Sequence, residues 1–183
     1  MGSTLVLSAE RFAGRVRIDA RGNAVFPHVD ADGICGYELK NHGFTGFASG
    51  GSKGLWMSDT KDDDTRIVFC ESSIDALSYA VLFPDEHARY ASIGGKPNPL
   101  QSELIRAAAT RMAGGSEIVA AMDADKAGRE LAEVVRKAVG LSGRVDLRFR
   151  IDEPEGVKDW NDLLRARPQI SATLDTAPTA RPT

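Results

Sequence analysis

The sequence predicts an α/β protein with a mostly parallel sheet flanked by helices, preceded by a small β-rich part. From Arg66 onward, short apolar runs alternate with segments whose apolar residues recur at helical spacing. Residues 15–58 instead contain short β-branched and aromatic runs separated by glycine turns. Strands that alternate with helices of this length are joined by crossovers, and crossovers of this kind produce a parallel sheet.

The first part, residues 1–64, is predicted to be a β-rich subdomain. Residues 30–33 (Asp-Ala-Asp-Gly) are typical of a hairpin turn between two of its strands. The following segment, 43–56, contains too many glycines for a helix. Three runs are predicted as strands: 16–18, 24–29 and 34–39.

The second part, residues 65–168, is predicted to hold the parallel sheet. Its strands are expected at 67–71, 90–95, 117–125 and 145–151. Its helices are expected from the apolar residues Ile74, Leu77 and Val81, from Leu100 to Met112, from Ala127 to Ala138, and from Asp159 to Arg167. The tail, 169–183, has several prolines and little apolar content, which predicts disorder.

Acidic residues occur where strands of the predicted sheet end. Glu71 ends the first strand, Asp123 and Asp125 end the third, and Asp75 falls in the first turn of the first helix. Ligands of open parallel sheets bind beyond the carboxyl ends of the strands. The four carboxylates are therefore expected to converge on one crevice, and hard oxygen ligands of this kind suit Mg²⁺.

Two of these carboxylates have an alternative role. Asp125 is equally well placed to cap the following helix, and Asp75 to complete a capping box with Ser72. Glu71 is more informative, because a carboxylate at the end of an apolar strand is costly unless it is paired or solvated. A capping role alone therefore does not account for the whole set.

Glycines and basic residues lie beside the acidic ones. Gly128 falls in the first turn of a helix, where glycine costs about 1 kcal/mol relative to alanine, which indicates a close approach to the backbone. Gly94 and Gly95 fit the same idea, with an ordinary strand-ending turn as the alternative. Lys126 and Arg129 are candidate phosphate clamps, with a solvated helix face as the alternative.

The glycine segment before Trp56 is not a P-loop, because Ser52 separates Gly51 from Lys53. We interpret it as a loop near the crevice, with Lys53 a candidate nucleic-acid contact. Three aromatic residues have two interpretations, base stacking or the more frequent core packing: Phe44, Phe47 and Trp56. His28, which follows a proline within a predicted strand, is interpreted as structural.

The order of these residues resembles the Toprim domain of primases, topoisomerases and some nucleases. The matching segments are 67–80 with Glu-x-x-x-Asp, 91–95 with Gly-Gly, 122–133 with Asp-x-Asp-x-x-Gly-Arg, and Lys-Asp-x-Asn-Asp-Leu-Leu at 158–164. Residues 22–41 resemble the strand-rich segment before Toprim in primase catalytic cores. The chain departs from the family at Ser72, where glycine is usual, although serine can cap a helix.

The resemblance implies a Rossmann-like Toprim sheet and a metal-dependent phosphoryl-transfer site. It implies Mg²⁺ or Mn²⁺ as cofactor, catalytic residues Glu71, Asp123 and Asp125, and metal ligands Glu71, Asp75, Asp123 and Asp125. The nucleic-acid or phosphate contacts are expected at Lys53, Gly95, Lys126, Gly128 and Arg129, with supporting residues Lys158 and Asp159. The expected activity is primase-type primer synthesis in DNA replication or plasmid mobilisation.

Composition bounds the remaining possibilities. A net charge of −3 gives no support for nucleic-acid binding by bulk charge, so a local patch or metal ions must supply it. The two cysteines and three histidines do not form a zinc or disulfide pattern, and no apolar run is long enough to span a membrane. We expect a cytoplasmic protein whose partners are single-stranded DNA, nucleotides and other domains of a longer protein. A binding-only module and a strand-cleaving Toprim enzyme are the alternatives.

Overall fold

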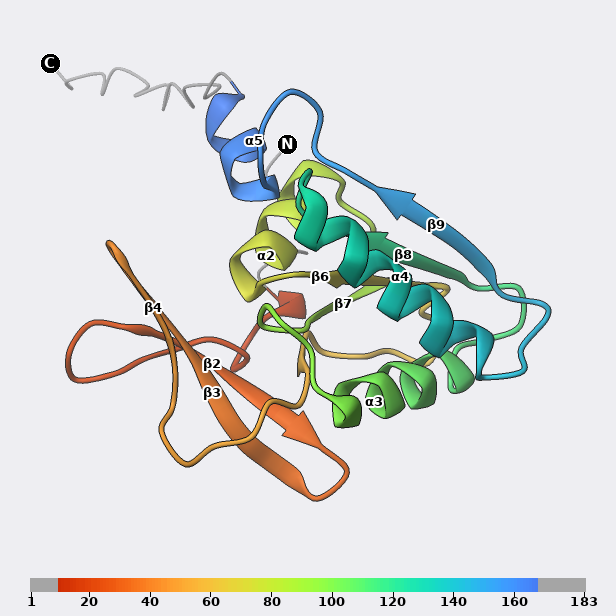
Figure 1. The fold of residues 1–183 in the computed structure, drawn as a ribbon, viewed down its shortest axis with the longest axis horizontal. Helices are drawn as coiled ribbons and strands as arrows, with labels where there is room; N and C mark the ends of the chain where they lie inside the picture. Colours follow the sequence, from red (N-terminus) through yellow and green to blue (C-terminus); the bar gives the residue numbers. More distant parts are fainter. Residues whose placement is uncertain (1–9, 168–183) are drawn as a thin grey trace, which may run out of the picture.

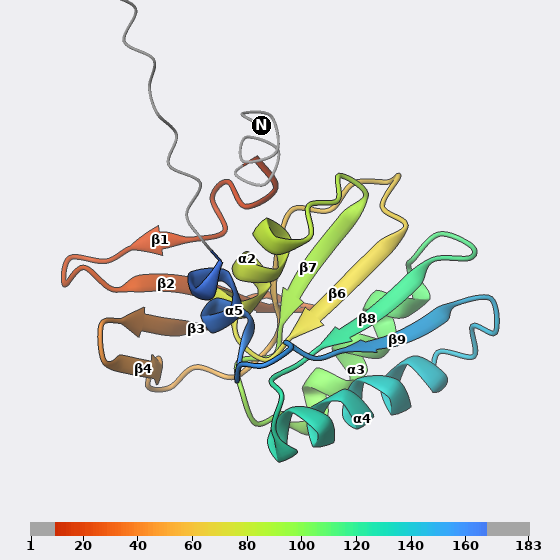
Figure 2. The ribbon, with the colours of Figure 1, turned by 90° about the horizontal axis from the view of Figure 1, so that it is seen from above.

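The computed structural model describes residues 10–167, which form two sheets and the helices that cover the larger one (Figures 1 and 2). The smaller sheet has the strand order β1-β2-β3-β4, and the larger has the order β5-β7-β6-β8-β9. The predicted disorder of 169–183 falls outside the described residues.

The smaller sheet is antiparallel throughout. The predicted hairpin turn joins β2 to β3, and Gly33 adopts a φ of +123° there, which glycine tolerates far better than other residues. A register shift follows His28, so the partner of the next residue, Val29, is Ile34. The four strands are β1 (Arg17–Ile18), β2 (Ala24–Asp30), β3 (Gly33–Asn41) and β4 (Phe44–Phe47).

The larger sheet confirms the predicted mostly parallel α/β arrangement. Strand β6 is parallel to both β7 and β8, and β8 is parallel to β9, whereas β5 pairs antiparallel with β7. The chain runs from β6 to β7 on one side and then crosses to β8 on the other, so the β6/β8 boundary is the topological switch point. The strands are β5 (Trp56–Met57), β6 (Arg66–Cys70), β7 (Ala88–Ser92), β8 (Glu117–Ala121) and β9 (Arg148–Asp152).

Helices cover both faces of the larger sheet, with α3 and α4 on one face and α2 and α5 on the other (Figure 2). The first face buries Ile67, Phe69 and Ile118 against α3 and α4, and the second buries Val68 and Val119 against α2. The helices are α2 (Ser73–Leu82), α3 (Pro99–Thr110), α4 (Lys126–Gly140) and α5 (Trp160–Ala166).

The structure differs from the sequence prediction in some details. Helix α2, predicted from Ile74, Leu77 and Val81, is present, but Val81 is 38% exposed and the buried residues include Ala76 and Ala80. Small alanines allow the helix backbone to approach the sheet closely, and the larger residues then flank the contact. Strand β9 begins later than predicted, and Val145 is fully exposed because it belongs to the preceding turn.

The smaller sheet lies beside the carboxyl ends of β6 and β7, as Figure 2 shows. Buried aromatic rings join the two sheets: Phe26 of β2 meets Trp56 of β5 edge-on at 5.8 Å, and both are fully buried. Backbone hydrogen bonds of 2.9 Å in both directions between Val29 and Leu55 continue this junction. The small sheet therefore forms one wall near the expected crevice. Within residues 10–167, no helix has the length and apolar character that crossing a membrane requires.

Candidate active site

The structure places Glu71 and Asp123 at the same edge of the larger sheet. Cys70, which precedes Glu71, is the register partner of Ala121, which lies two residues before Asp123. Asp75 occupies the first turn of α2, and Asp125 is the N-cap residue of α4. The four predicted carboxylates thus lie at the switch point, beyond the carboxyl ends of β6 and β8.

Asp123 is the most constrained of the four carboxylates. Its side chain is 8% exposed, and its Oδ1 atom is buried without a hydrogen-bond partner among the described residues. Burial, followed by the negative charges of Asp75 and Glu71, raises the pKa of Asp123 to about 7. A carboxylate in this position carries a charge that the protein does not compensate.

The neighbouring carboxylates experience the same repulsion. Burial raises the pKa of Glu71, and the charges of Asp125 and Asp75 raise it further. Burial is also the main cause of the raised pKa of Asp75, with a further contribution from Asp159. Because each group disfavours the ionised form of another, the set is electrostatically coupled, and a cation would relieve all of them together.

Three aspartates at this edge cap helices or lie in a cap, and the capping role predicted for Asp125 is confirmed. The Oδ1 atom of Asp125 accepts a hydrogen bond from Gly128 N at 2.9 Å, and Asp159 caps α5 by accepting from Asp162 N at 2.7 Å. The Ser72 hydroxyl accepts from Asp75 N and donates to the Asp75 carboxylate. Each carboxylate has two oxygens, so a helix cap uses only part of its capacity to accept hydrogen bonds or to ligate an ion.

Chemically, these residues fit a divalent cation. Their oxygens are hard ligands of the kind that Mg²⁺ and Mn²⁺ take, and the unpartnered Oδ1 of Asp123 is a buried acceptor in need of a positive charge. In the arrangement of residues 10–167, no three His, Cys, Asp or Glu side chains are grouped closely enough to ligate one ion. An ion that keeps several of its waters needs only one or two direct carboxylates.

The Gly94–Gly95 turn acts on the acidic site through the backbone. Both N–H groups donate to the Glu71 carbonyl oxygen, at 2.8 and 3.0 Å, and both residues have a positive φ. The N–H of Gly95, where a phosphate contact was predicted, is thus already bonded within the chain. The turn fixes the main chain at Glu71.

Gly128 is also explained by the chain itself. A Cβ atom at this position would lie 2.1 Å from the carbonyl oxygen of Asp123. The close approach predicted from the sequence exists, but the approaching group is the Asp123 backbone rather than a phosphate. Helix α4 can therefore start directly against the residue that carries the buried carboxylate.

Gly128→Ala is expected to destabilise the protein by about 2 kcal/mol or more, because the new methyl group displaces the Asp123 backbone. Urea unfolding measures the change. Gly140→Ala is the matched control, since it lies in the same helix and its Cβ would have no neighbour within 4 Å. Equal stability of the two variants would contradict this account of Gly128.

The structure gives Lys53 a contact within the chain. Its ammonium group donates to the carbonyl oxygens of Gly94 at 2.7 Å and Lys96 at 3.2 Å. The Lys53 carbonyl in turn accepts from Asn98 Nδ2 at 3.0 Å. Lys53 thus joins the glycine-rich loop to the turn after β7, and its predicted contact with nucleic acid stays a prediction.

Two of the remaining basic residues lie in the first turn of α4, directly after Asp125. The side chain of Lys126 is 88% exposed and lies 3.7 Å from Glu130, and Arg129 is exposed. Lys158 lies 4.0 Å from Asp125, and its charge lowers the pKa values of Glu71 and Asp123. The Lys158 carbonyl accepts from Ala124 N at 2.8 Å, which ties the start of α5 to the acidic loop.

Sequence reasoning missed the contribution of β3. Glu38 is buried, accepts hydrogen bonds from the Ser73 hydroxyl at 2.7 Å and Ser73 N at 3.3 Å, and lies 2.9 Å from Lys40 Nζ. The charge of Lys40 lowers the pKa values of Glu71 and Asp75. The available signal was a pair of charged residues alternating within the β3 pattern, which a strand with one solvated face also shows.

Two family models match the chain, and they divide it between the β-rich part and the part with the parallel sheet. A family model described as Toprim-like matches residues 68–164, and one described as a protein of unknown function, DUF3991, matches residues 4–64. No curated protein matches the chain. This chain is also similar to a chain in one solved structure. That structure is of bacteriophage T7 lagging-strand DNA polymerase interacting with primase domains of two gp4 subunits bound to an RNA/DNA hybrid and dTTP. The identity is 19%, the TM-score is 0.43, and the match covers 84% of this chain and 78% of that one.

Proposed function

The chain belongs to the Toprim-like family, and from that premise we propose that it is a metal-dependent phosphoryl-transfer domain of the primase type that acts on nucleic acid. One observation carries the proposal: buried and mutually repelling carboxylates meet at the switch point of the sheet. Such an arrangement is unfavourable for stability unless a cation or a proton joins it.

One or two carboxylates would ligate the ion directly, and the others would contact the water molecules that the ion keeps; the four residues are Glu71, Asp75, Asp123 and Asp125. A bound Mg²⁺ or Mn²⁺ neutralises charge on the phosphates and stabilises the attacking and leaving oxygens. This requirement also explains how a domain with a net charge of −3 approaches a polyanion. Asp159 supports the site by capping α5 beside it.

The chain's own groups divide the remaining tasks. Glu71 has a raised pKa and is only partly buried, which suits a carboxylate that accepts a proton from a substrate. Lys158 lies beside Asp125, Lys126 and Arg129 follow Asp125 on α4, and all three serve as phosphate contacts. Lys40, on strand β3 of the small sheet, adds a further positive charge that acts on Glu71. Single-stranded DNA and nucleotides are the proposed substrates.

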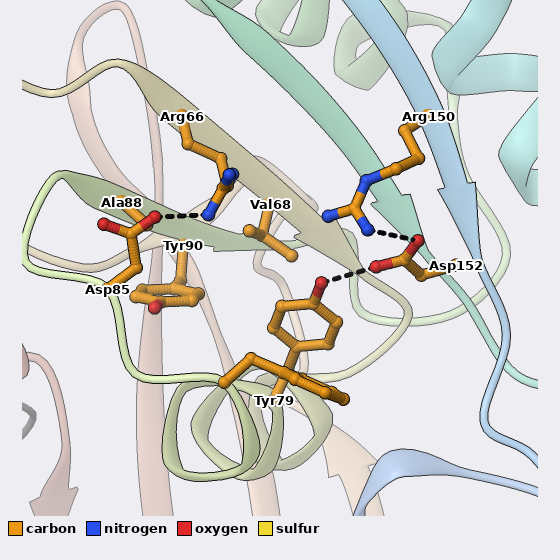
Figure 3. A pocket seen from close by; sticks show the side chains of 9 residues that line it. Arg66, Val68, Tyr79, Asp85, Ala88, Tyr90, Arg150 and Asp152 are labelled. Atoms are coloured by element: carbon orange, nitrogen blue, oxygen red, sulfur yellow. Dashed lines mark hydrogen bonds and ion pairs between the residues drawn. The ribbon is translucent and has the colours of Figure 1, made fainter.

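Strand cleavage by Tyr79 or Tyr90 is disfavoured. Tyr79 and Tyr90 are 4% and 3% exposed, and burial raises the pKa of both hydroxyls, which makes them poor nucleophiles. The Tyr79 hydroxyl donates to Asp152 in a pocket that also holds Arg66 and Arg150 (Figure 3). Tyr37 lies on β3, where it forms a backbone pair with Pro27.

A side-by-side assay of synthesis and cleavage tests the proposal. A labelled single strand is incubated with ribonucleotides or deoxyribonucleotides and with Mg²⁺ or Mn²⁺. We expect extended products that require the metal. Shortened products that vanish in Glu71→Gln would indicate a Toprim nuclease instead. If neither product forms with either metal and with the native full-length protein, the enzyme proposal is wrong and the binding-only module is the remaining alternative.

A further inference from the structure

The small sheet has one face that the larger sheet covers and one that no described element covers. Phe26 and His28 of β2, and Glu38 of β3, are buried on the inner face. Residues directly opposite each other in an antiparallel pair share a face, so Pro27 and Tyr37 lie together on the other side. We call this second side the outer face; its strand residues are Arg17, Val25, Pro27, Val29, Ile34, Tyr37, Leu39, Asn41, Phe44 and Gly46.

The outer face presents two aromatic rings to solvent. Phe44 is 50% exposed and Tyr37 is 38% exposed, although both lie on regular strands. A Cβ atom at Gly46 would lie 2.7 Å from the Phe44 ring, so glycine at 46 lets the ring lie close over the β4 backbone. A ring held against a strand offers its open side as a stacking surface.

The other two aromatic residues considered for stacking face the interior. Trp56 is fully buried and donates from Nε1 to the Arg15 carbonyl at 2.7 Å, and Phe47 packs edge-on against His28 at 5.2 Å. Core packing is therefore their role. Phe44 is the member of that set that reaches the surface, and Tyr37 accompanies it.

The charge on the outer face is positive. Arg17 is exposed and is the charged residue among the ten outer-face positions. A shallow hollow next to it is lined by Arg15, Arg17, Pro27, Ile34 and Met57, and the Arg15 guanidinium is ion-paired with Asp59. The face therefore combines apolar rings with the guanidinium group of Arg17 at its rim, which complements bases and a phosphate.

We propose that the outer face binds single-stranded nucleic acid, with bases stacked on Tyr37 and Phe44 and a backbone phosphate at Arg17. The ligand class rests on the proposed function, whereas the surface itself is separate from the acidic site. Binding is tolerant of sequence because every base has a stacking face. The surface holds a strand on the side of the small sheet opposite the carboxylates.

Fluorescence anisotropy with a labelled oligothymidylate, in EDTA, tests this surface. Tyr37→Ala with Phe44→Ala is expected to weaken binding at least about tenfold. Tyr37→Phe keeps the ring and is expected to keep the affinity. Arg17→Ala is expected to reduce the slope of log affinity against log salt by about one. Leu141→Ala, at a residue 72% exposed on another face, is the control.

The variants separate this proposal from the catalytic one. Asp123→Asn with Asp125→Asn is expected to keep oligothymidylate binding. Binding without turnover would therefore support nucleic-acid binding by the outer face independently of the catalytic proposal. Unchanged affinity in Tyr37→Ala/Phe44→Ala, or no binding by the parent, would overturn it. If the same variant leaves DNA affinity unchanged but converts a parent dimer to a monomer in light scattering, the face is a protein interface and the proposal is wrong.

Discussion

Glu71→Gln is expected to reduce turnover by about 100-fold or more while leaving the affinity for single-stranded DNA nearly unchanged. The substitution keeps the size of the side chain but removes both the negative charge and the ability to accept a proton. Glu71 is only partly buried, and its main-chain carbonyl stays bonded to Gly94 and Gly95, so the fold should tolerate the change. Initial rates and binding isotherms on the same oligonucleotide measure the two effects.

Glu86→Gln is the matched control for this prediction. Glu86 is exposed and precedes β7 at the amino end of the sheet, away from the carboxylates. Its activity should equal that of the parent. If Glu71→Gln and Glu86→Gln retain the same activity, then Glu71 neither moves a proton nor holds the ion, and the assignment of the site would be wrong.

Asp123→Asn is expected to stabilise the metal-free protein above pH 7. The pKa of Asp123 is raised to about 7 from its ordinary value of 3.8, so the folded state binds a proton more tightly than the unfolded chain. The resulting stabilisation is fully present below about pH 4 and is lost as the pH rises to about 7. The two pKa values limit the loss to about 4 kcal/mol, and partial screening by Lys158 and water makes about 2 kcal/mol the expected gain.

Urea unfolding in EDTA between pH 4 and pH 8 measures this gain as the difference between variant and parent. The difference should be small at pH 4 and should grow through pH 7, because asparagine does not titrate. Asp32→Asn, at an exposed turn, should show no such growth. A pH-independent difference between Asp123→Asn and the parent would mean that Asp123 is not held in a strongly repulsive environment.

The alternation of strands and helices was sufficient to predict the mostly parallel sheet. Apolar runs such as 67–70 are buried on both sides, and the match of residues 68–164 to the Toprim-like family confirms the resemblance drawn from Glu71, Asp75, Asp123 and Asp125. Positions after strands were predictable because the carboxyl ends of parallel strands share an edge. Whether those residues bind metal is a separate question that binding experiments decide.

The contacts between distant segments could not be predicted in the same way. For Lys53, the sequence predicts a nucleic-acid contact but does not reveal that the Gly94 carbonyl lies 2.7 Å from its ammonium group. Gly128 carried a correct signal of close approach, but the identity of the approaching group required the fold. The Glu38–Lys40 pair depends on how the small sheet docks on Ser73, which local spacing does not encode.

Thermal unfolding with added Mn²⁺ tests the central claim most directly, namely that the carboxylates at the β6/β8 switch point hold a divalent cation. The account predicts that Mn²⁺ raises the melting temperature of the parent in a concentration-dependent way, since an ion that binds only the folded state stabilises it by mass action. Asp123→Asn with Asp125→Asn should abolish that rise. An equal response of the double variant and the parent to Mn²⁺ would contradict the account.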